Sequence, residues 1–355
     1  MRPQRAFLDK TAAYRRQHFC LLLSEMNITI LGAGAWGTAL AISLSARHRI
    51  TLWGRDAAQI ATMRASRRNQ SYLPEIPLPQ ELNLTADFQV ACSAAELMLV
   101  AVPIAALRST LQHIAQLPDP VPVVWACKGF EADSAQLPHQ VIAETLPQNI
   151  PSGVLSGPSF ALEVARGLPT ALTLASRDGE FARHTAQSLH HARLRIYSST
   201  DVMGVEVGGA VKNVLAIAAG ISDGMGFGHN ARAALITRGL AEMARLGIKL
   251  GGRVETLSGL TGAGDLILTC TGDLSRNRKV GTLLAQHHAL PDILRQLGHV
   301  AEGVYTVREV HRLAQRLGVD MPICEAVYRV LYEQIPAASA VEALLNRAAN
   351  SEFNP

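Results

Sequence analysis

The sequence predicts an α/β protein of two domains, a doubly wound N-terminal domain over residues 26–203 and an all-α C-terminal domain over residues 204–345. Short runs rich in Val, Ile and Leu alternate with helical patterns up to about residue 199. Their continuous hydrophobicity is typical of parallel strands that helices cover on both faces. Strand signals stop after Asp201, and the length of 355 residues is about twice that of a usual domain.

The elements follow in order along the chain. Seven strands are predicted at residues 28–31, 50–53, 97–102, 121–126, 154–156, 171–175 and 194–197. Helices are predicted at 202–219, 231–246, 280–286, 304–317 and 323–332, separated by short turns that contain glycine. Residues 346–355 are expected to be a frayed tail. Residues 1–25 are expected to be an extension, either disordered or preceding the real start at Met26, since their apolar run is shorter than that of a secretory signal.

Composition excludes several classes of protein. Only 17% of residues are charged and 48% are hydrophobic, which indicates large buried interfaces between domains or subunits, so a homodimer is possible. Residues 1–25 carry five basic and two acidic residues, or +3 of the formal net charge of +4. The near-neutral remainder argues against nucleic acid as a partner. No uninterrupted apolar stretch reaches the roughly 18 residues of a membrane span, so no integral membrane segment is predicted.

The cysteines and histidines indicate the cellular location and the capacity to bind a metal. The five cysteines are scattered without a C-x-x-C pair, which fits reduced thiols in a cytoplasmic protein better than disulfides or a zinc site. The histidines show no metal-ligand spacing, and we predict no metal site.

A glycine-rich turn follows the first predicted strand. The turn reads Gly32-Ala33-Gly34-Ala35-Trp36-Gly37 and leads into a helical pattern. The spacing G-x-G-x-x-G is weak alone, but between a strand and a helix it indicates a dinucleotide site. Gly32 permits the tight turn, Gly34 lets a pyrophosphate approach the backbone, and Gly37 lets helix and strand pack closely. The N-terminus of the helix then offers N–H groups to the phosphates.

The second predicted strand ends next to Arg55 and Asp56. An arginine here can pair with the 2′-phosphate of NADP, whereas an acidic residue at the tip of the strand favours NAD. We predict that NADP is accepted and preferred, although Asp56 leaves use of both cofactors open. The alternative is that Arg55 is an ordinary solvated surface residue.

Lys212 lies in a largely apolar predicted helix, where Val205, Gly209 and Ala216 share its face. A lysine partly removed from water has a lowered pKa, as a general acid/base near neutral pH requires. The alternative is a snorkelling lysine that pairs with an acidic residue across the domain interface. Position alone does not separate the two.

Other polar residues fall where a ligand crevice is expected. Lys128 and the turn containing Gly157 and Ser159 follow consecutive predicted strands, at the carboxyl edge where doubly wound sheets bind ligands. Each could also be merely a turn. Two polar islands occur in the helical half, and their candidate residues are Asp265 in the first and Ser275, Arg276 and Asn277 in the second. The second cluster suits a phosphate, with Arg276 able to bind it bidentately, but a solvated loop explains it equally well.

Taken together, these strings resemble the bacterial NAD(P)-dependent glycerol-3-phosphate dehydrogenases. The matching strings lie at residues 32–40, 157–161, 206–213, 230–239, 264–266, 274–278 and 301–303. They occur in the right order and cover the chain from Met26 to about residue 340. Three mild departures, at Ala35, Leu162 and Ala263, remove no residue with a named role.

The resemblance implies a Rossmann-type domain, NADP or NAD as cofactor, and interconversion of dihydroxyacetone phosphate and sn-glycerol 3-phosphate, which feeds phospholipid synthesis. It implies Lys212 as the proton donor and acceptor. It implies a substrate site of Lys128, Gly157, Ser159, Lys212, Asp265, Ser275, Arg276 and Asn277. It implies cofactor contacts at Trp36, Arg55, Lys128, Ala161, Arg276, Val300 and Glu302, beside the glycines of the turn.

Two rival functions remain open at the level of sequence. Another two-domain hydroxyacid or hydroxyacyl dehydrogenase would need a different substrate anchor than the cluster at residues 275–277. A non-catalytic NADP-sensing protein would keep the turn at Gly32 without needing Lys212 or Asp265.

Overall fold

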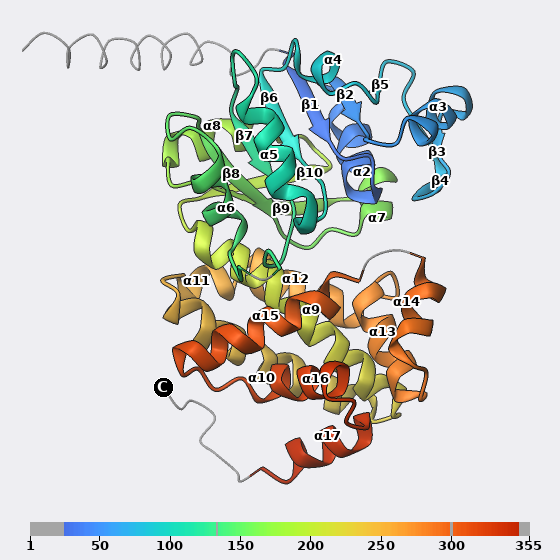
Figure 1. Cartoon of the computed structure of the whole chain (residues 1–355), viewed down its shortest axis with the longest axis vertical. Coiled ribbons are helices and arrows are strands. Elements are labelled where there is room, and N and C mark those ends of the chain that lie inside the picture. The colour runs from blue at the N-terminus through green and yellow to red at the C-terminus, as the bar shows by residue number, and fades with distance from the viewer. Residues whose placement is uncertain (1–24, 133, 299–300, 348–355) are drawn as a thin grey trace, which may run out of the picture.

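The computed structural model describes residues 25–132, 134–298 and 301–347. An α/β half and a helical half are stacked along the long axis (Figure 1). The main sheet has eight strands in the order β10-β9-β8-β7-β6-β1-β2-β5. In chain order they are β1 (Asn27–Leu31), β2 (Arg49–Trp53), β5 (Asn83–Thr85), β6 (Leu97–Val100), β7 (Val123–Trp125), β8 (Ser152–Ser156), β9 (Thr170–Ala175) and β10 (Leu194–Ser199).

All seven predicted strands are present, and the fold class is confirmed. The sequence analysis missed the edge strand β5 and a small hairpin of β3 (Arg68–Asn69) and β4 (Leu73–Pro77). β3 and β5 have only two and three residues, and β4 is interrupted by Pro74 and Glu75, so none of them has the continuous apolar run that reveals a buried strand.

The sheet is parallel except that β9 runs antiparallel to β8. Between these strands lies only α7 (Ala161–Ala165), a helix of five residues. At 1.5 Å per residue it spans about 7.5 Å, less than half the length of a five-residue strand. The chain does not return to the start of β8 after this helix, and β9 begins at the carboxyl edge.

Helices cover both faces of the sheet, and each face has its own hydrophobic cluster. Leu40, Ile60 and Leu189 belong to the cluster on one face, whereas Leu107, Leu111 and Val141 belong to the other. The helices are α2 (Ala35–Leu44), α3 (Ala57–Ser66), α4 (Phe88–Cys92), the 3-10 turn η1 (Ile104–Ala106), α5 (Leu107–Ala115), α6 (Pro138–Thr145), α7 and α8 (Gly179–Leu189).

The helical half is built around α9 (Val202–Gly224), which runs from the sheet into the middle of the other helices (Figure 1). Those helices are α10 (Gly228–Lys249), α11 (Val254–Leu257), the π-helical turn η2 (Leu260–Gly264), α12 (Asp265–Thr271), α13 (Arg276–Ala285), α14 (Leu290–Leu297), α15 (Glu302–Leu317), α16 (Pro322–Tyr332) and α17 (Ala337–Leu345). All five predicted helices are present with longer bounds, and the short helices α11, α12, α14 and α17 were missed.

Helix α9 belongs to both hydrophobic cores. Val202 and Val205 pack in a cluster of the sheet, whereas Val207 and most later residues pack in the core of the helical half. The helix is long and apolar enough to cross a membrane, but 94% of its most apolar window is buried inside the protein, as in a core helix. A β-carbon at Gly220 would lie 1.9 Å from the carbonyl oxygen of Arg278, so the backbones of α9 and α13 are in contact.

Candidate active site

Two lysines from different halves of the molecule bind the same carboxylate. Asp265 is the first residue of α12 and is only 1% exposed. Its Oδ1 accepts a hydrogen bond of 2.6 Å from Lys212 Nζ on α9, and its Oδ2 accepts one of 2.6 Å from Lys128 Nζ. Lys128 follows β7, so this carboxylate joins the edge of the sheet to the helical half.

The amine of Lys212 is held from a second direction. It donates to Thr269 Oγ1 at 3.0 Å, and Thr269 Oγ1 donates to the backbone oxygen of Asp265 at 2.6 Å. An ammonium group has three hydrogens. Among the described residues Asp265 and Thr269 take two of them, which leaves one for the oxygen of a ligand.

Burial and charge set the ionisation of this cluster. Burial lowers the pKa of Lys212 to about 8, with Asp265 opposing and Lys128 adding to the shift. For Asp265, burial raises the pKa, but the two lysines outweigh it and hold the pKa below its ordinary value. A carboxylate between two ammonium groups and an amine that titrates near neutral pH can together support proton transfer.

The turn after β8 joins the same cluster. Gly157 has a φ of +138°, a backbone conformation that favours glycine. Its carbonyl oxygen accepts hydrogen bonds from Lys128 Nζ at 3.3 Å and from Ser159 Oγ at 3.0 Å. The structure therefore brings together Lys128, Gly157 and Ser159 at the carboxyl edge of the sheet, as the sequence predicted.

The predicted phosphate cluster begins α13. Ser275 caps this helix, since its Oγ accepts from the backbone N–H of Arg278. Asn277 is buried, donates to Asn213 Oδ1 at 3.0 Å and accepts from the N–H of Gly303 at 3.0 Å. Arg276 is exposed in the first turn of the helix. Ser275 and Asn277 thus hold the helix in place, while Arg276 is the most accessible donor of the three.

The glycine turn has room for a phosphate. A β-carbon added to Gly34 would meet no atom within 4 Å, whereas one added to Gly37 would lie 1.9 Å from the oxygen of Gly32. The first turn of α2 has no side-chain cap and no acidic residue, so none of its own side chains competes with a phosphate for its N–H groups. These residues fit the pyrophosphate of a dinucleotide.

The other predicted cofactor residues lie at several places. Trp36 and Ala161 pack against one hydrophobic cluster between α2 and α7. Arg55 is exposed beyond β2, and Asp56 next to it caps α3 by accepting from the N–H groups of Ala58 and Gln59. Val300 lies outside the described residues.

Glu302 begins α15 and interacts electrostatically with the cluster. Burial raises the pKa of Glu302, and the charges of Arg276, Lys128 and Lys212 oppose the shift. Arg276 and Glu302 are the first residues of α13 and α15. The N-termini of these helices are therefore close enough to Lys128 and Lys212 for all three cations to act on Glu302.

Sequence reasoning missed three residues that support the site. Thr269 lies four residues after Asp265, a spacing that could have indicated it had α12 been predicted. Asn69 in the missed hairpin donates to the oxygen of Ala33 at 3.0 Å and so holds the glycine turn. Glu206 binds Trp125 and His139 across the two halves, and its charge within the apolar run of α9 is the same kind of signal that singled out Lys212.

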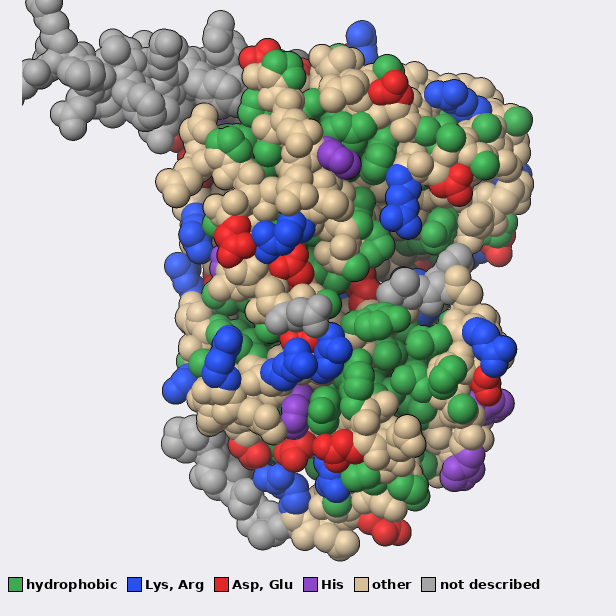
Figure 2. Space-filling model, viewed as in Figure 1, with side chains coloured by type: hydrophobic (Ala, Val, Ile, Leu, Met, Phe, Trp, Pro, Cys, Tyr) green, Lys and Arg blue, Asp and Glu red, His purple; other side chains and the backbone are tan. Residues whose placement is uncertain are grey.

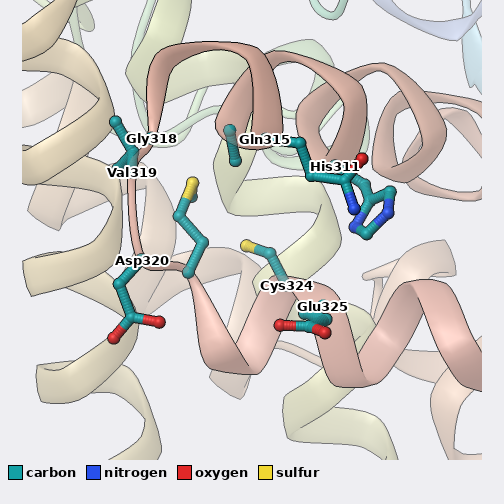
Figure 3. Close-up of a pocket in the computed structure, with 9 residues that line it drawn as sticks. His311, Gln315, Gly318, Val319, Asp320, Cys324 and Glu325 are labelled. Carbon is teal, nitrogen blue, oxygen red and sulfur yellow. The ribbon is translucent and has the colours of Figure 1, made fainter.

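Two hollows lie away from the Asp265 cluster, and neither is lined by a residue of that cluster. A pocket of about 290 Å³ lies between α15 and α16, where His311 and Gln315 face Asp320, Cys324 and Glu325 (Figure 3). A larger groove of about 1,370 Å³ runs between α10, α16 and α17. In the described part of the chain, no group of three or more His, Cys, Asp or Glu residues could hold a metal ion.

The outline of the molecule is indented between the α/β half and the helical half (Figure 2). The Asp265 cluster joins the two halves at the carboxyl edge that also bears the glycine turn. This arrangement defines a two-domain dehydrogenase with a glycine turn of the dinucleotide-binding type and a buried lysine where its halves meet.

Comparison with known proteins identifies the family. The N-terminal model of NAD-dependent glycerol-3-phosphate dehydrogenase matches residues 27–182, and the C-terminal model matches residues 201–342. The chain is 62% identical over 332 residues to a glycerol-3-phosphate dehydrogenase [NAD(P)+] of Nitrosospira multiformis, a match that covers 92% of this chain and 100% of that protein. The chain belongs to the NAD-dependent glycerol-3-phosphate dehydrogenase family.

Two further members of this family are similar to the chain. A glycerol-3-phosphate dehydrogenase [NAD(P)+] of Thiobacillus denitrificans is 60% identical over 328 residues, covering 92% of this chain and 100% of that one. The crystal structure of glycerol-3-phosphate dehydrogenase from Coxiella burnetii has a TM-score of 0.87 and 42% identity, and the match covers 91% of this chain and 99% of that chain. A D-mandelate dehydrogenase with NADH has a TM-score of 0.55 at 16% identity, which shows a shared fold alone.

Proposed function

We propose that this chain catalyses the reversible reduction of dihydroxyacetone phosphate to sn-glycerol 3-phosphate with NADPH or NADH. The observation that carries the proposal is the buried Lys212 on Asp265, which also binds Lys128 at the sheet edge that bears the glycine turn. Family membership supports the same reaction. The product would supply phospholipid synthesis. A location in the cytoplasm fits the four described cysteines, which are buried free thiols.

Lys212 is the proton donor in this proposal. When bound, the reduced nicotinamide supplies the hydride that adds to C2 of the ketone. The ammonium of Lys212 gives its proton to the oxygen that develops negative charge at C2, and in the reverse direction the neutral amine takes the proton back. Asp265 and Thr269 fix the direction of the amine, so that its remaining N–H faces the substrate.

The other predicted residues bind and orient the substrate. Lys128 stabilises the developing negative charge through its ammonium group. Arg276, as the exposed donor at the start of α13, binds the phosphate, while Ser275 and Asn277 hold the helix that presents it. Binding energy from the remote phosphate then orients the carbonyl, and closure of the two halves excludes water.

The turn beyond β2 favours NADP in this proposal. The carboxylate of Asp56 accepts from Ala58 N at 2.9 Å and from Gln59 N at 3.2 Å. Because these bonds occupy the acidic side chain at the start of α3, Arg55 is the residue left to meet the ribose and its 2′-phosphate.

We also propose a homodimer, with a second copy covering the groove between α10, α16 and α17. The groove is lined mainly by Ala, Val, Leu and Ile side chains, and Ile248 and Leu345 remain 49% and 73% exposed there. Exposed apolar surface of this extent is typical of a protein interface.

The first test measures loss of NADPH absorbance with dihydroxyacetone phosphate and with other carbonyl compounds. We expect turnover with dihydroxyacetone phosphate and its loss in Lys212→Ala, with NADPH binding nearly intact. Lys249→Ala, an exposed lysine on α10, is the matched control and should behave as wild type. Near-normal kcat in Lys212→Ala would exclude Lys212 as the proton donor.

A further inference from the structure

A buried acidic side chain lies at the boundary between the two hydrophobic cores. Glu206 is 4% exposed and lies between Val205, which packs in the core of the sheet, and Val207, which packs in the core of the helical half. A carboxylate in such surroundings is costly unless its oxygens accept hydrogen bonds. The partners of Glu206 therefore show what this residue does.

Glu206 ties three elements together. Its Oε1 accepts from Trp125 Nε1 at 2.9 Å and from the backbone N–H of His139 at 2.8 Å, and its Oε2 lies 2.5 Å from His139 Nδ1. Trp125 ends β7, and His139 lies in the first turn of α6. One side chain of α9 thus binds the end of a central strand and the start of a helix in the α/β half.

Glu206 lies near both lysines of the proposed function along the chain, one on its own helix α9 and one just beyond the strand β7 that it binds. Lys128 is three residues beyond Trp125, and Lys212 is six residues beyond Glu206 on the same helix. A six-residue segment of helix is a rigid spacer of about 9 Å. The place where Glu206 fastens α9 to β7 therefore sets where the amines of Lys212 and Lys128 meet Asp265.

We propose that Glu206 is a positioning residue for catalysis, which holds α9 against β7 and α6 so that Lys212 and Lys128 share Asp265. The inference rests on the proposed function for its kinetic consequence. The structural consequence, a fixed and poorly hydrated Lys212, does not depend on the identity of the substrate.

Glu206→Ala and Glu206→Gln separate positioning from general stability. In Glu206→Ala the tie is lost, and we expect kcat to fall by roughly 10- to 100-fold, because small displacements of reacting groups are costly. The affinity for NADPH should change by less than about threefold, since the glycine turn is not touched. In Glu206→Gln the amide oxygen can still accept from Trp125 Nε1 and the backbone N–H of His139, and the amide NH2 can donate to Nδ1 of a neutral His139, so we expect most of kcat to be rescued.

The titration of Lys212 gives a readout that needs no substrate. Competitive acetylation at a series of pH values, followed by mass spectrometry, measures the pKa of this amine. Its main influences are burial, Asp265, Lys128 and Glu302. A looser boundary would admit water, so in Glu206→Ala the pKa of Lys212 should rise toward its ordinary value, whereas in Glu206→Gln it should stay near the wild-type value.

Glu242 provides the matched control. It is a buried carboxylate on α10 that accepts from the backbone N–H groups of Ile323 and Cys324 at the start of α16. Glu242→Ala should lower Tm, as Glu206→Ala does, without changing kcat or the titration of Lys212. A Glu206→Ala enzyme with lowered Tm but wild-type kcat and titration would overturn the proposal, and so would failure of Glu206→Gln to rescue.

If Glu206→Ala does not fold, Trp125→Phe removes a single donor and keeps an aromatic ring. We expect the same changes in kcat and in the titration of Lys212, to a smaller extent, and no change in either would overturn the proposal. A wild-type protein inactive on dihydroxyacetone phosphate would instead contradict the proposed function. The labelling experiment would still decide the role of Glu206.

Discussion

Lys212 and Lys128 share one carboxylate, and this sharing determines how the site responds to pH. Asp265 stabilises both ammonium groups, while burial disfavours the charge on Lys212. The two effects leave the pKa of Lys212 at about 8, within the range of a general acid/base. The amine of Lys212 can therefore carry a proton near neutral pH and still lose it, as the proposed function requires.

This pKa predicts opposite pH dependences for the two directions of the reaction. Reduction needs the ammonium form, so kcat/KM should fall roughly tenfold per pH unit once pH exceeds the pKa of about 8 in the free enzyme. Oxidation of sn-glycerol 3-phosphate needs the neutral amine, so its kcat/KM should rise through the same range. Steady-state kinetics would measure both pH profiles, and a deuterated cofactor would show whether hydride transfer limits the rate. Parallel profiles in the two directions would contradict the role of Lys212.

A second prediction at the scale of residues concerns cofactor preference. In Arg55→Ala we expect kcat/KM with NADPH to fall by about tenfold or more while kcat/KM with NADH changes little, because a charge-assisted contact to the 2′-phosphate is lost. Asp56→Ala is the control, since it removes the cap of α3 and should lower Tm without changing the ratio. An unchanged ratio in Arg55→Ala would show that Arg55 is not the selective residue.

At the scale of elements, the glycine turn and α2 jointly form the phosphate site of the proposed function. The turn is held from outside, since the oxygen of Ala33 accepts from Asn69 and from Gln59. Gly37 is needed because α2 packs directly on the turn, and Gly34 faces open space. The two glycines therefore have different physical tasks.

This difference predicts different outcomes for two similar substitutions. Gly34→Ala should fold with an unchanged Tm but weaken NADPH binding by about tenfold or more, near 1.4 kcal/mol, because the methyl group takes the place of the pyrophosphate. Gly37→Ala should instead destabilise the protein by roughly 1–3 kcal/mol or more, since its β-carbon would overlap the oxygen of Gly32. Thermal unfolding and titration of NADPH fluorescence measure the two effects. The same loss of Tm in both variants would contradict this assignment.

At the scale of the whole molecule, one helix belongs to both cores, and one large apolar groove remains uncovered. Helix α9 continues from the core of the sheet into that of the helical half, so the position of each half depends on the other. The groove of α10, α16 and α17 is on the helical half, and α17 lies at the lower edge in Figure 1. A second copy seated there would leave the catalytic cluster of each chain intact.

The proposed dimer can be measured directly. Light scattering coupled to size exclusion should give twice the chain mass of 38.1 kDa for the wild type. Ile248→Asp should give the mass of one chain, because an interface of standard size does not accept an unpaired buried charge. Val90→Asp, an exposed apolar residue on α4 outside the groove, should remain dimeric. A wild-type mass of one chain would contradict the proposal.

Sequence alone was enough to predict the fold class, seven strands of the main sheet, the glycine turn between β1 and α2, and the family. These features depend on local patterns, namely continuous apolar runs, the spacing of Gly32, Gly34 and Gly37, and strings of specific residues in order. Lys212 stood out in the same way, as a charge in an apolar helix. Whether it is catalytic, or only paired with an acid, could not be settled from its position.

The remaining features depend on contacts between residues far apart in the chain. Asp265 is 53 residues from Lys212 and 137 from Lys128, and Glu206 is 81 residues from Trp125. No periodicity encodes such pairings, because they arise only when both cores have packed around α9. The antiparallel pairing of β9 with β8 is likewise a contact that no periodicity specifies. Local sequence thus specified the parts of the site, and packing between the two halves set the distances at which those parts can react.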